Sequence, residues 1–143
     1  MTTCEHDWLY ARIGAVCPDA VVFSDREGII RLWNRGAELI FGFRPEDALG
    51  RSLDLIIPEA QRSRHWDGYH RVMATGESSY ATRLLSAPAL RRDGARLSVE
   101  FSMVVVRDEG GEIYGVGAII RDVTERWQRE KALRERLAEL EKR

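Results

Sequence analysis

The hydrophobic pattern is most distinctive between residues 58 and 76. Proline suits the first turn of a helix and glycine its end, so Pro58 and Gly76 give the predicted bounds of a helix. Residues at i, i+4, i+7 and i+8 share one helical face, which here carries His65, Tyr69, Val72 and Met73. A histidine is therefore predicted on the buried side of an amphipathic helix, where its imidazole needs a partner.

Before this helix, the pattern predicts an N-terminal amphipathic helix over residues 3–16 and then an early hairpin. Its strands are expected at 20–24 and 29–33, joined by a turn that ends at Gly28. Asn34 can cap the next helix, which Gly42 ends. A short helical turn at 44–50 and an apolar stretch at 53–57 lead into the longer helix.

After Gly76 the period changes to two, which is typical of strands. Strands are predicted at 78–90, around 97–103 and at 112–120, separated by glycine-containing turns at 91–94 and 108–111. Pro88 lacks an N–H donor, so the first of these strands is expected at a sheet edge. The chain therefore has five predicted strands, with all the short helices between the second and the third.

The C-terminal stretch from residue 125 to 143 is rich in strong helix formers. Asp122 and Glu125 have the spacing of a capping box at its start. Leu133, Leu137 and Leu140 follow one another at spacings of four and three residues. This is the spacing of the apolar seam of a coiled coil. We expect this helix to form a homodimer.

A chain of 143 residues allows one domain with an appendage, so we divide it into 1–17, 18–124 and 125–143. The net charge of −1 and the absence of a basic patch argue against nucleic-acid binding. No apolar run approaches the roughly 18 residues of a membrane span, and no signal-peptide profile opens the chain. The expected location is the cytoplasm. No nucleophile–base pair or phosphate loop is recognisable, so we do not expect an enzyme.

The order of predicted elements resembles that of PAS domains, and so do several short motifs. These motifs, within residues 18–124, are Asp25-Arg26-Glu27-Gly28-Ile29-Ile30, Trp33-Asn34, Ala37-Glu38, Phe41-Gly42-Phe43, Glu46, Gly50, Arg91-Arg92-Asp93-Gly94 and Arg121-Asp122-Val123-Thr124. The resemblance implies an α+β fold: a five-stranded antiparallel sheet of order 2-1-5-4-3, with helices on one face around a ligand cavity, and a C-terminal coiled-coil helix. PAS domains usually serve as sensors in signal transduction or as dimerisation modules.

A narrower resemblance concerns the oxygen-sensing haem PAS domains of FixL-type histidine kinases. These carry Arg-x-x-His on the same helix, which matches Arg62-Ser63-Arg64-His65. The resemblance implies haem b as the cofactor, with His65 on the iron and Arg71 at a propionate. The apolar strand against the porphyrin would carry Val99, Phe101 and Met103, and Tyr69 would contact the same ligand.

The sequence also departs from the FixL-type pattern. The distal arginine that contacts bound oxygen in that family aligns with Leu85, and Arg83 could replace it only after a shift in the preceding loop. The residues Trp66-Asp67-Gly68 after the histidine differ as well. No cysteine follows Cys17, which excludes an adduct-forming flavin photosensor but not non-covalent flavin or another small ligand.

Each candidate residue also has a plainer interpretation. His65 could be a core histidine bonded to a carbonyl, Arg71 could pair with Asp67, and Met103 could be a core residue rather than a distal ligand. Two functions follow: a gas or redox sensor that relays its change through the C-terminal helix, or a ligand-free module for dimerisation and protein interaction. In either, the signalling partner acts in trans or is an output domain that these 143 residues lack.

Overall fold

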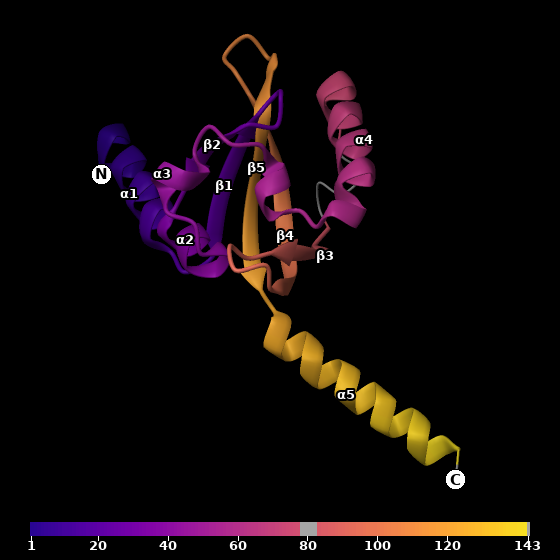
Figure 1. The fold of residues 1–143 in the computed structure, drawn as a ribbon. Coiled ribbons are helices and arrows are strands. Elements are labelled where there is room, and N and C mark those ends of the chain that lie inside the picture. Colours follow the sequence, from indigo (N-terminus) through magenta and orange to yellow (C-terminus); the bar gives the residue numbers. More distant parts are fainter. Residues whose placement is uncertain (78–82, 143) are drawn as a thin grey trace.

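The computed structural model describes residues 1–77 and 83–142 (Figure 1). α2 and α3 lie beside β1 and β2 at one end of the sheet, and α4 lies beside β3 and β4 at the other. The elements are α1 (Thr3–Val16), β1 (Ala20–Asp25), β2 (Ile30–Trp33), α2 (Arg35–Phe41), α3 (Pro45–Ala48), the 3-10 helix η1 (Leu53–Ile56), α4 (Glu59–Thr75), β3 (Leu85–Leu90), β4 (Arg96–Arg107), β5 (Ile113–Asp122) and α5 (Thr124–Glu141).

The five strands form one antiparallel sheet of order β2-β1-β5-β4-β3. This confirms the predicted fold class and strand order. Pro88 lies in the edge strand β3, which pairs with β4 on one side. An edge strand tolerates proline because the missing backbone N–H is not needed to pair with a second strand.

The core lies between the inner face of the sheet and the helices of the β1–β2 end. Phe41 of α2 and Ile30 of β2 are its largest fully buried side chains. The rings of Trp33 and Phe41 lie 5.5 Å apart, and the Trp33 indole donates a 2.9 Å hydrogen bond to the carbonyl of Phe43. Burial of these aromatic side chains is the main stabilisation of this end of the domain.

Asn34 caps α2, as predicted, and joins three further segments. Its Oδ1 accepts from the N–H groups of Ala37 (2.9 Å) and Val21 (2.8 Å). Its amide nitrogen donates to the carbonyls of Gly14 (2.7 Å) and Asp19 (3.0 Å). One buried amide therefore fixes the end of α1 and the start of β1 relative to α2.

Two expected boundaries differ in the structure. The strand predicted over 78–90 begins at Leu85: residues 78–82 lie outside the described residues, and residues 83 and 84 are not in a strand. The predicted capping box of the last helix is wrong, because Val123 is the N-cap and no side chain caps it. Asp122 instead accepts from the Thr124 N–H at 2.9 Å, whereas a capping box between Thr2 and Glu5 is formed at the start of α1.

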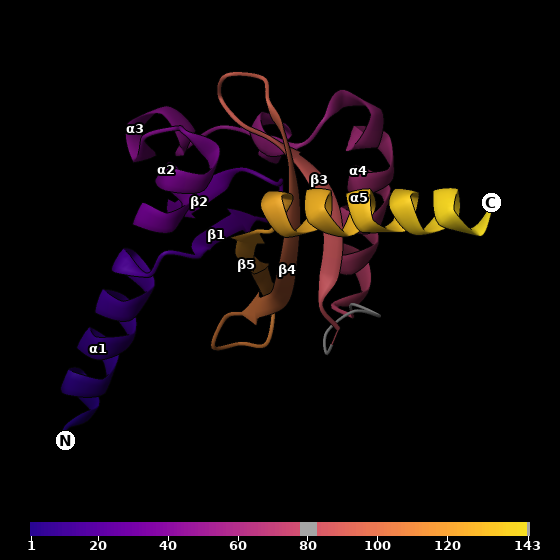
Figure 2. The same cartoon turned by 90° about the horizontal axis from the view of Figure 1, so that it is seen from below.

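α1 and α5 project from the domain and bury none of their residues (Figure 2). Along α5 the leucines of the predicted seam are exposed, with 66% of Leu133, 59% of Leu137 and 53% of Leu140 accessible. Of the helices in residues 1–77 and 83–142, none is long and apolar enough to cross a membrane.

Candidate functional site

The inner face of the sheet is only partly covered where α4 lies beside it. Directly paired residues share a face of a sheet, and the pairs Phe101–Ile120 and Met103–Ala118 place Phe101 and Met103 on the core face. Along β4 this face changes from buried at Leu97 and Val99 to half-buried at Phe101 and Met103. Leu85, which pairs with Phe101, is half-buried too. An apolar surface therefore remains partly open beside α4.

α4 is a helix of 17 residues with Pro58 as its N-cap. Gly76 ends it in the left-handed conformation (φ 71°), and its N–H donates to the carbonyl of Val72 at 2.7 Å. The predicted face is inward: Tyr69 and Met73 are buried, and His65 and Val72 are half-buried. The helix and its inward histidine therefore match the expectation.

The imidazole of His65 is half-buried, and its Nδ1 is enclosed without a hydrogen bond among the described residues. The hydrogen bond to a carbonyl that is expected of an ordinary core histidine is thus absent at Nδ1 among the described residues. The ring contacts Trp66, with centroids 4.6 Å apart, and Tyr69 at 5.7 Å. Burial lowers the pKa of His65 below its ordinary value, although the Asp54 carboxylate opposes this. The ring is therefore neutral at neutral pH and carries a free nitrogen lone pair.

Hydrogen bonds hold α4 in place at its middle and at its C-terminal end. The Tyr69 hydroxyl donates to the backbone carbonyl of Asp25 and lies 3.0 Å from the Ser24 hydroxyl. Burial raises the pKa of Tyr69, an effect that the Ser24 hydrogen bond reduces. At the C-terminal end, the guanidinium of Arg107 donates to the carbonyl of Gly76 at 3.2 Å. The Tyr69 hydroxyl, expected at a ligand, thus serves to attach the helix to β1.

Near its N-terminus, α4 is attached to η1 by Arg62 and Trp66, in contacts that the sequence pattern did not predict. The Trp66 indole donates to the Asp54 carboxylate at 2.8 Å. Arg62 donates to the carbonyls of Ile57 (3.0 Å) and Asp54 (3.2 Å). The Trp66 ring also covers Gly28, where a Cβ atom would lie 2.2 Å from the indole, so this turn needs glycine. The sequence hinted at the attachment by Trp66 only because this residue differs from the FixL-type pattern.

The two candidate arginines lie outside this cluster. Arg71 is exposed on α4 and forms no ion pair with Asp67, although both residues are in the described part of the chain. Arg83 is exposed and precedes β3, whereas Leu85 begins that strand. The structure thus groups His65 and Tyr69 on a helix beside the strand of Val99, Phe101 and Met103, with both arginines on the surface.

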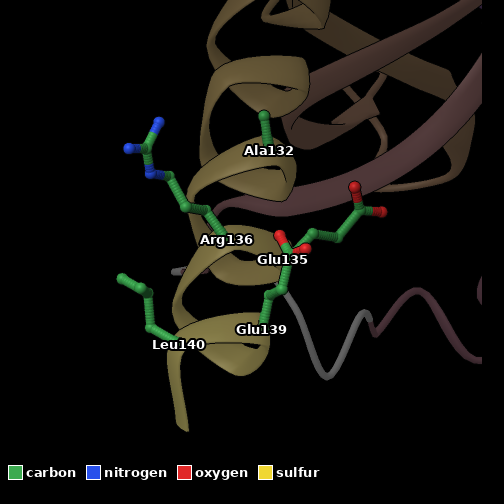
Figure 3. A pocket seen from close by; sticks show the side chains of 5 residues that line it. All are labelled: Ala132, Glu135, Arg136, Glu139 and Leu140. Carbon is green, nitrogen blue, oxygen red and sulfur yellow. The ribbon is translucent and has the colours of Figure 1, made fainter. Parts of the chain in front are cut away.

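Two grooves of the described surface lie away from α4 and include none of its residues. The larger, of about 710 Å³, lies between β3, β4 and the first turns of α5, where Trp127 is 42% exposed. The smaller, of about 370 Å³, lies on α5 alone and is lined by Ala132, Glu135, Arg136, Glu139 and Leu140 (Figure 3). The candidate site at His65 is therefore defined by its side chains and not by an open groove.

The same side chains restrict the kind of metal that His65 could bind. Within residues 1–77 and 83–142, no three His, Cys, Asp or Glu side chains gather as a metal site. One imidazole suffices for an iron that is already held by a macrocycle, as in haem. The donor set and the apolar face beside it thus fit haem better than a bare metal ion.

The first turn of α5 is bonded to the strand that carries this apolar face. The Ser98 N–H donates to the Thr124 hydroxyl at 3.0 Å, and the Val123 N–H donates to the Ser98 carbonyl at 2.9 Å. Arg126 forms an ion pair with Glu100 of β4. Glu100 neighbours Phe101, so the surface beside α4 and the root of α5 meet on adjacent residues of one strand.

A pH dependence of stability follows from the burial of His65. Its folded-state pKa is lowered, so below about 6.5 the unfolded chain binds a proton that the folded chain resists. Stability should be fully present above that pH and should fall as the pH drops through the folded pKa. Urea unfolding between pH 7.5 and 5 should show a steeper loss in the wild type than in His65→Ala. If the free energy of unfolding fell equally with pH in the wild type and in His65→Ala, the lowered pKa of His65 would be contradicted. His70→Ala is the control for removing a histidine from α4.

Comparison with known proteins gives consistent matches. A family model described as "PAS fold" matches residues 15–128. The chain is 33% identical over 123 residues to the sensor protein FixL of Bradyrhizobium diazoefficiens, covering 86% of this chain and 24% of FixL. It is 23% identical over 105 residues to the oxygen sensor protein DosP of Escherichia coli, covering 73% of this chain and 13% of DosP. The chain thus spans less than a quarter of the length of either relative.

A solved PAS domain from Colwellia psychrerythraea superposes with a TM-score of 0.74. It has 22% sequence identity, and the match covers 84% of this chain and 98% of that one. At this identity the match supports the fold, which agrees with the sheet order described above.

Proposed function

This chain belongs to the PAS family of sensory domains, and we propose that it binds haem b through His65 as a gas or redox sensor in signal transduction. In this proposal a change at His65 would alter the surface of β4 beside α4. The bonds of Ser98 and Glu100 to the first turn of α5 would pass the change to that helix and, through it, to a partner protein or a further domain.

One observation carries the proposal: a neutral, half-buried imidazole lies on a helix beside a partly open apolar strand face. His65 would bind the iron through an imidazole nitrogen, and Leu85, Val99, Phe101 and Met103 would contact the porphyrin. Arg71 would pair with a propionate, since a guanidinium binds a carboxylate in a bidentate way. Arg83 is the candidate for a contact on the gas-binding side. Bound haem iron would provide a coordination position for a diatomic gas or a one-electron redox change.

Two of the curated relatives support the sensory part of the proposal. FixL is named a sensor protein and DosP an oxygen sensor protein. Both matches include the helix of His65 within the PAS region. Because this chain spans only a small part of each, the output of the relatives is not transferred to it.

A titration of the purified protein with haemin tests the proposal. We expect an intense Soret band that saturates at one haem per chain, because one His65 is present in each chain. A haemin spectrum that shows no saturable change on mixing with the protein, and protein that is colourless once free haemin is removed, would overturn the haem proposal. The PAS fold and its sensory class would be unaffected by that result.

A second function, a ligand-free dimerisation module, is favoured by a separate observation. α5 exposes Leu133, Leu137 and Leu140 at coiled-coil spacing and buries no residue against its own domain. A second copy of the helix would cover this seam. This function needs no ligand at His65, so the two proposals are tested by different variants.

A further inference from the structure

Two polar atoms on the inward side of α4 are enclosed without a hydrogen bond in the described structure. They are the Oε1 atom of Gln61 and the Nδ1 atom of His65. The two residues are four positions apart on one helix, so their side chains lie on the same face, one turn from each other. Leaving a buried polar group unpaired is unfavourable, so each atom needs a partner.

The two atoms are chemically complementary. Burial keeps His65 neutral, and a neutral imidazole carries one N–H donor and one acceptor nitrogen. The amide oxygen of Gln61 is an acceptor only. The two atoms are not bonded to each other in the described structure. If the imidazole proton is on Nδ1 and the Gln61 side chain rotates toward it, the Nδ1–H can donate to the amide oxygen, and the lone pair is then on Nε2.

The other polar groups around His65 are already engaged. The Asp54 carboxylate accepts from the Trp66 indole at 2.8 Å and lies 3.9 Å from the Arg62 guanidinium. The Tyr69 hydroxyl is bonded to β1. Gln61 Oε1 is thus the enclosed acceptor on α4 that has no partner of its own in the described structure.

We propose that Gln61 is a positioning residue for His65: its amide oxygen accepts the Nδ1–H and thereby directs the Nε2 lone pair toward the ligand. Outer hydrogen bonds of this kind fix the tautomer and ring orientation of metal-binding histidines and raise their basicity. The tautomer itself needs no ligand, whereas its effect on haem affinity rests on the proposed function.

The first test uses the apo protein, ¹⁵N-labelled, above pH 7. Long-range ¹H–¹⁵N correlation spectra distinguish the two tautomers, and the His65 signals are assigned by their loss in His65→Ala. We expect the Nδ1–H form in the wild type, its loss in Gln61→Leu, and its retention in Gln61→Glu, whose carboxylate also accepts. A wild-type Nε2–H form, or an unchanged tautomer in folded Gln61→Leu, would overturn the proposal.

The second test uses haemin titration of the same variants. Gln61→Leu should bind haem about 10- to 100-fold more weakly, the usual effect of losing such a partner, and Gln61→Glu should bind near wild-type strength. If haem fails to bind the wild type but the tautomers behave as expected, only the haem proposal fails. If haem binds and the tautomer does not depend on residue 61, only the role of Gln61 fails.

Discussion

Replacing His65 with alanine should abolish the Soret band of protein loaded with haem. The expected loss of haem affinity is at least about 100-fold, since even an outer hydrogen-bond partner of a ligand contributes 10- to 100-fold. The physical reason is that the other two histidines, His6 and His70, are exposed, whereas His65 lies on the inward face of α4. The measurement is a haemin titration followed by absorption, with gel filtration to remove loosely bound haem.

His70→Ala is the matched control, because it removes an exposed histidine from the same helix. It should retain the wild-type Soret band and haem affinity. Circular dichroism should show that His65→Ala still folds, since His65 is half-buried and not part of the hydrophobic core. A full Soret band in folded His65→Ala would assign the haem ligand elsewhere.

Replacing Leu137 with glutamate should convert the proposed dimer into a monomer. Leu137 is 59% exposed in the single chain, and burying a leucine fully contributes about 1.5–3 kcal/mol. Two such side chains meet across the seam, and the variant would also place two negative charges there. We therefore expect the dimer Kd to rise at least about 100-fold, as measured by sedimentation equilibrium.

Gln128→Glu provides the control for charge, because it adds the same negative charge to α5 outside the leucine seam. On the heptad that contains Leu133 and Leu137, residue 128 lies on the outer side of the helix. The control variant should dimerise like the wild type. A wild-type chain that stays monomeric at high concentration would contradict dimerisation through α5.

Much of the fold could be predicted because it depends on local signals. Asn34 and Gly42 bound α2, and Gly76 ends α4, because these residue types favour caps and left-handed backbone wherever they occur. The alternation along β4 followed from the pleat, which places successive side chains on opposite faces. The order of the strands came from the resemblance to PAS domains and not from these local signals.

The attachments of α4 could not be predicted, because they join residues far apart in the chain. The Tyr69 hydroxyl meets Ser24, 45 positions earlier, and the Trp66 indole meets Asp54 across a turn. A helical pattern identifies the inward face but does not say which polar group opposes each side chain. For the same reason, the pattern placed His65 inward without revealing that its Nδ1 would be enclosed and unpaired.

The cap of α5 shows how a local signal can fail. Asp122 and Glu125 have capping-box spacing, but β5 extends through Asp122, and the helix starts at Thr124. The carboxylate therefore bonds to the Thr124 N–H and hydroxyl, at 2.9 Å and 2.5 Å. Sheet pairing moved the start of the helix past the position that the motif indicated.

The attachment of α5 at its N-terminal end has a mechanical consequence. With 18 residues at 1.5 Å each, the helix is a rod about 27 Å long that is anchored where Arg126 meets Glu100 and Thr124 meets Ser98. A rotation of about 5° at that anchor would swing the free tip through about 2 Å. A shift of less than about 1 Å in β4 would thus become a larger displacement at the C-terminal end of α5, so the helix acts as a lever.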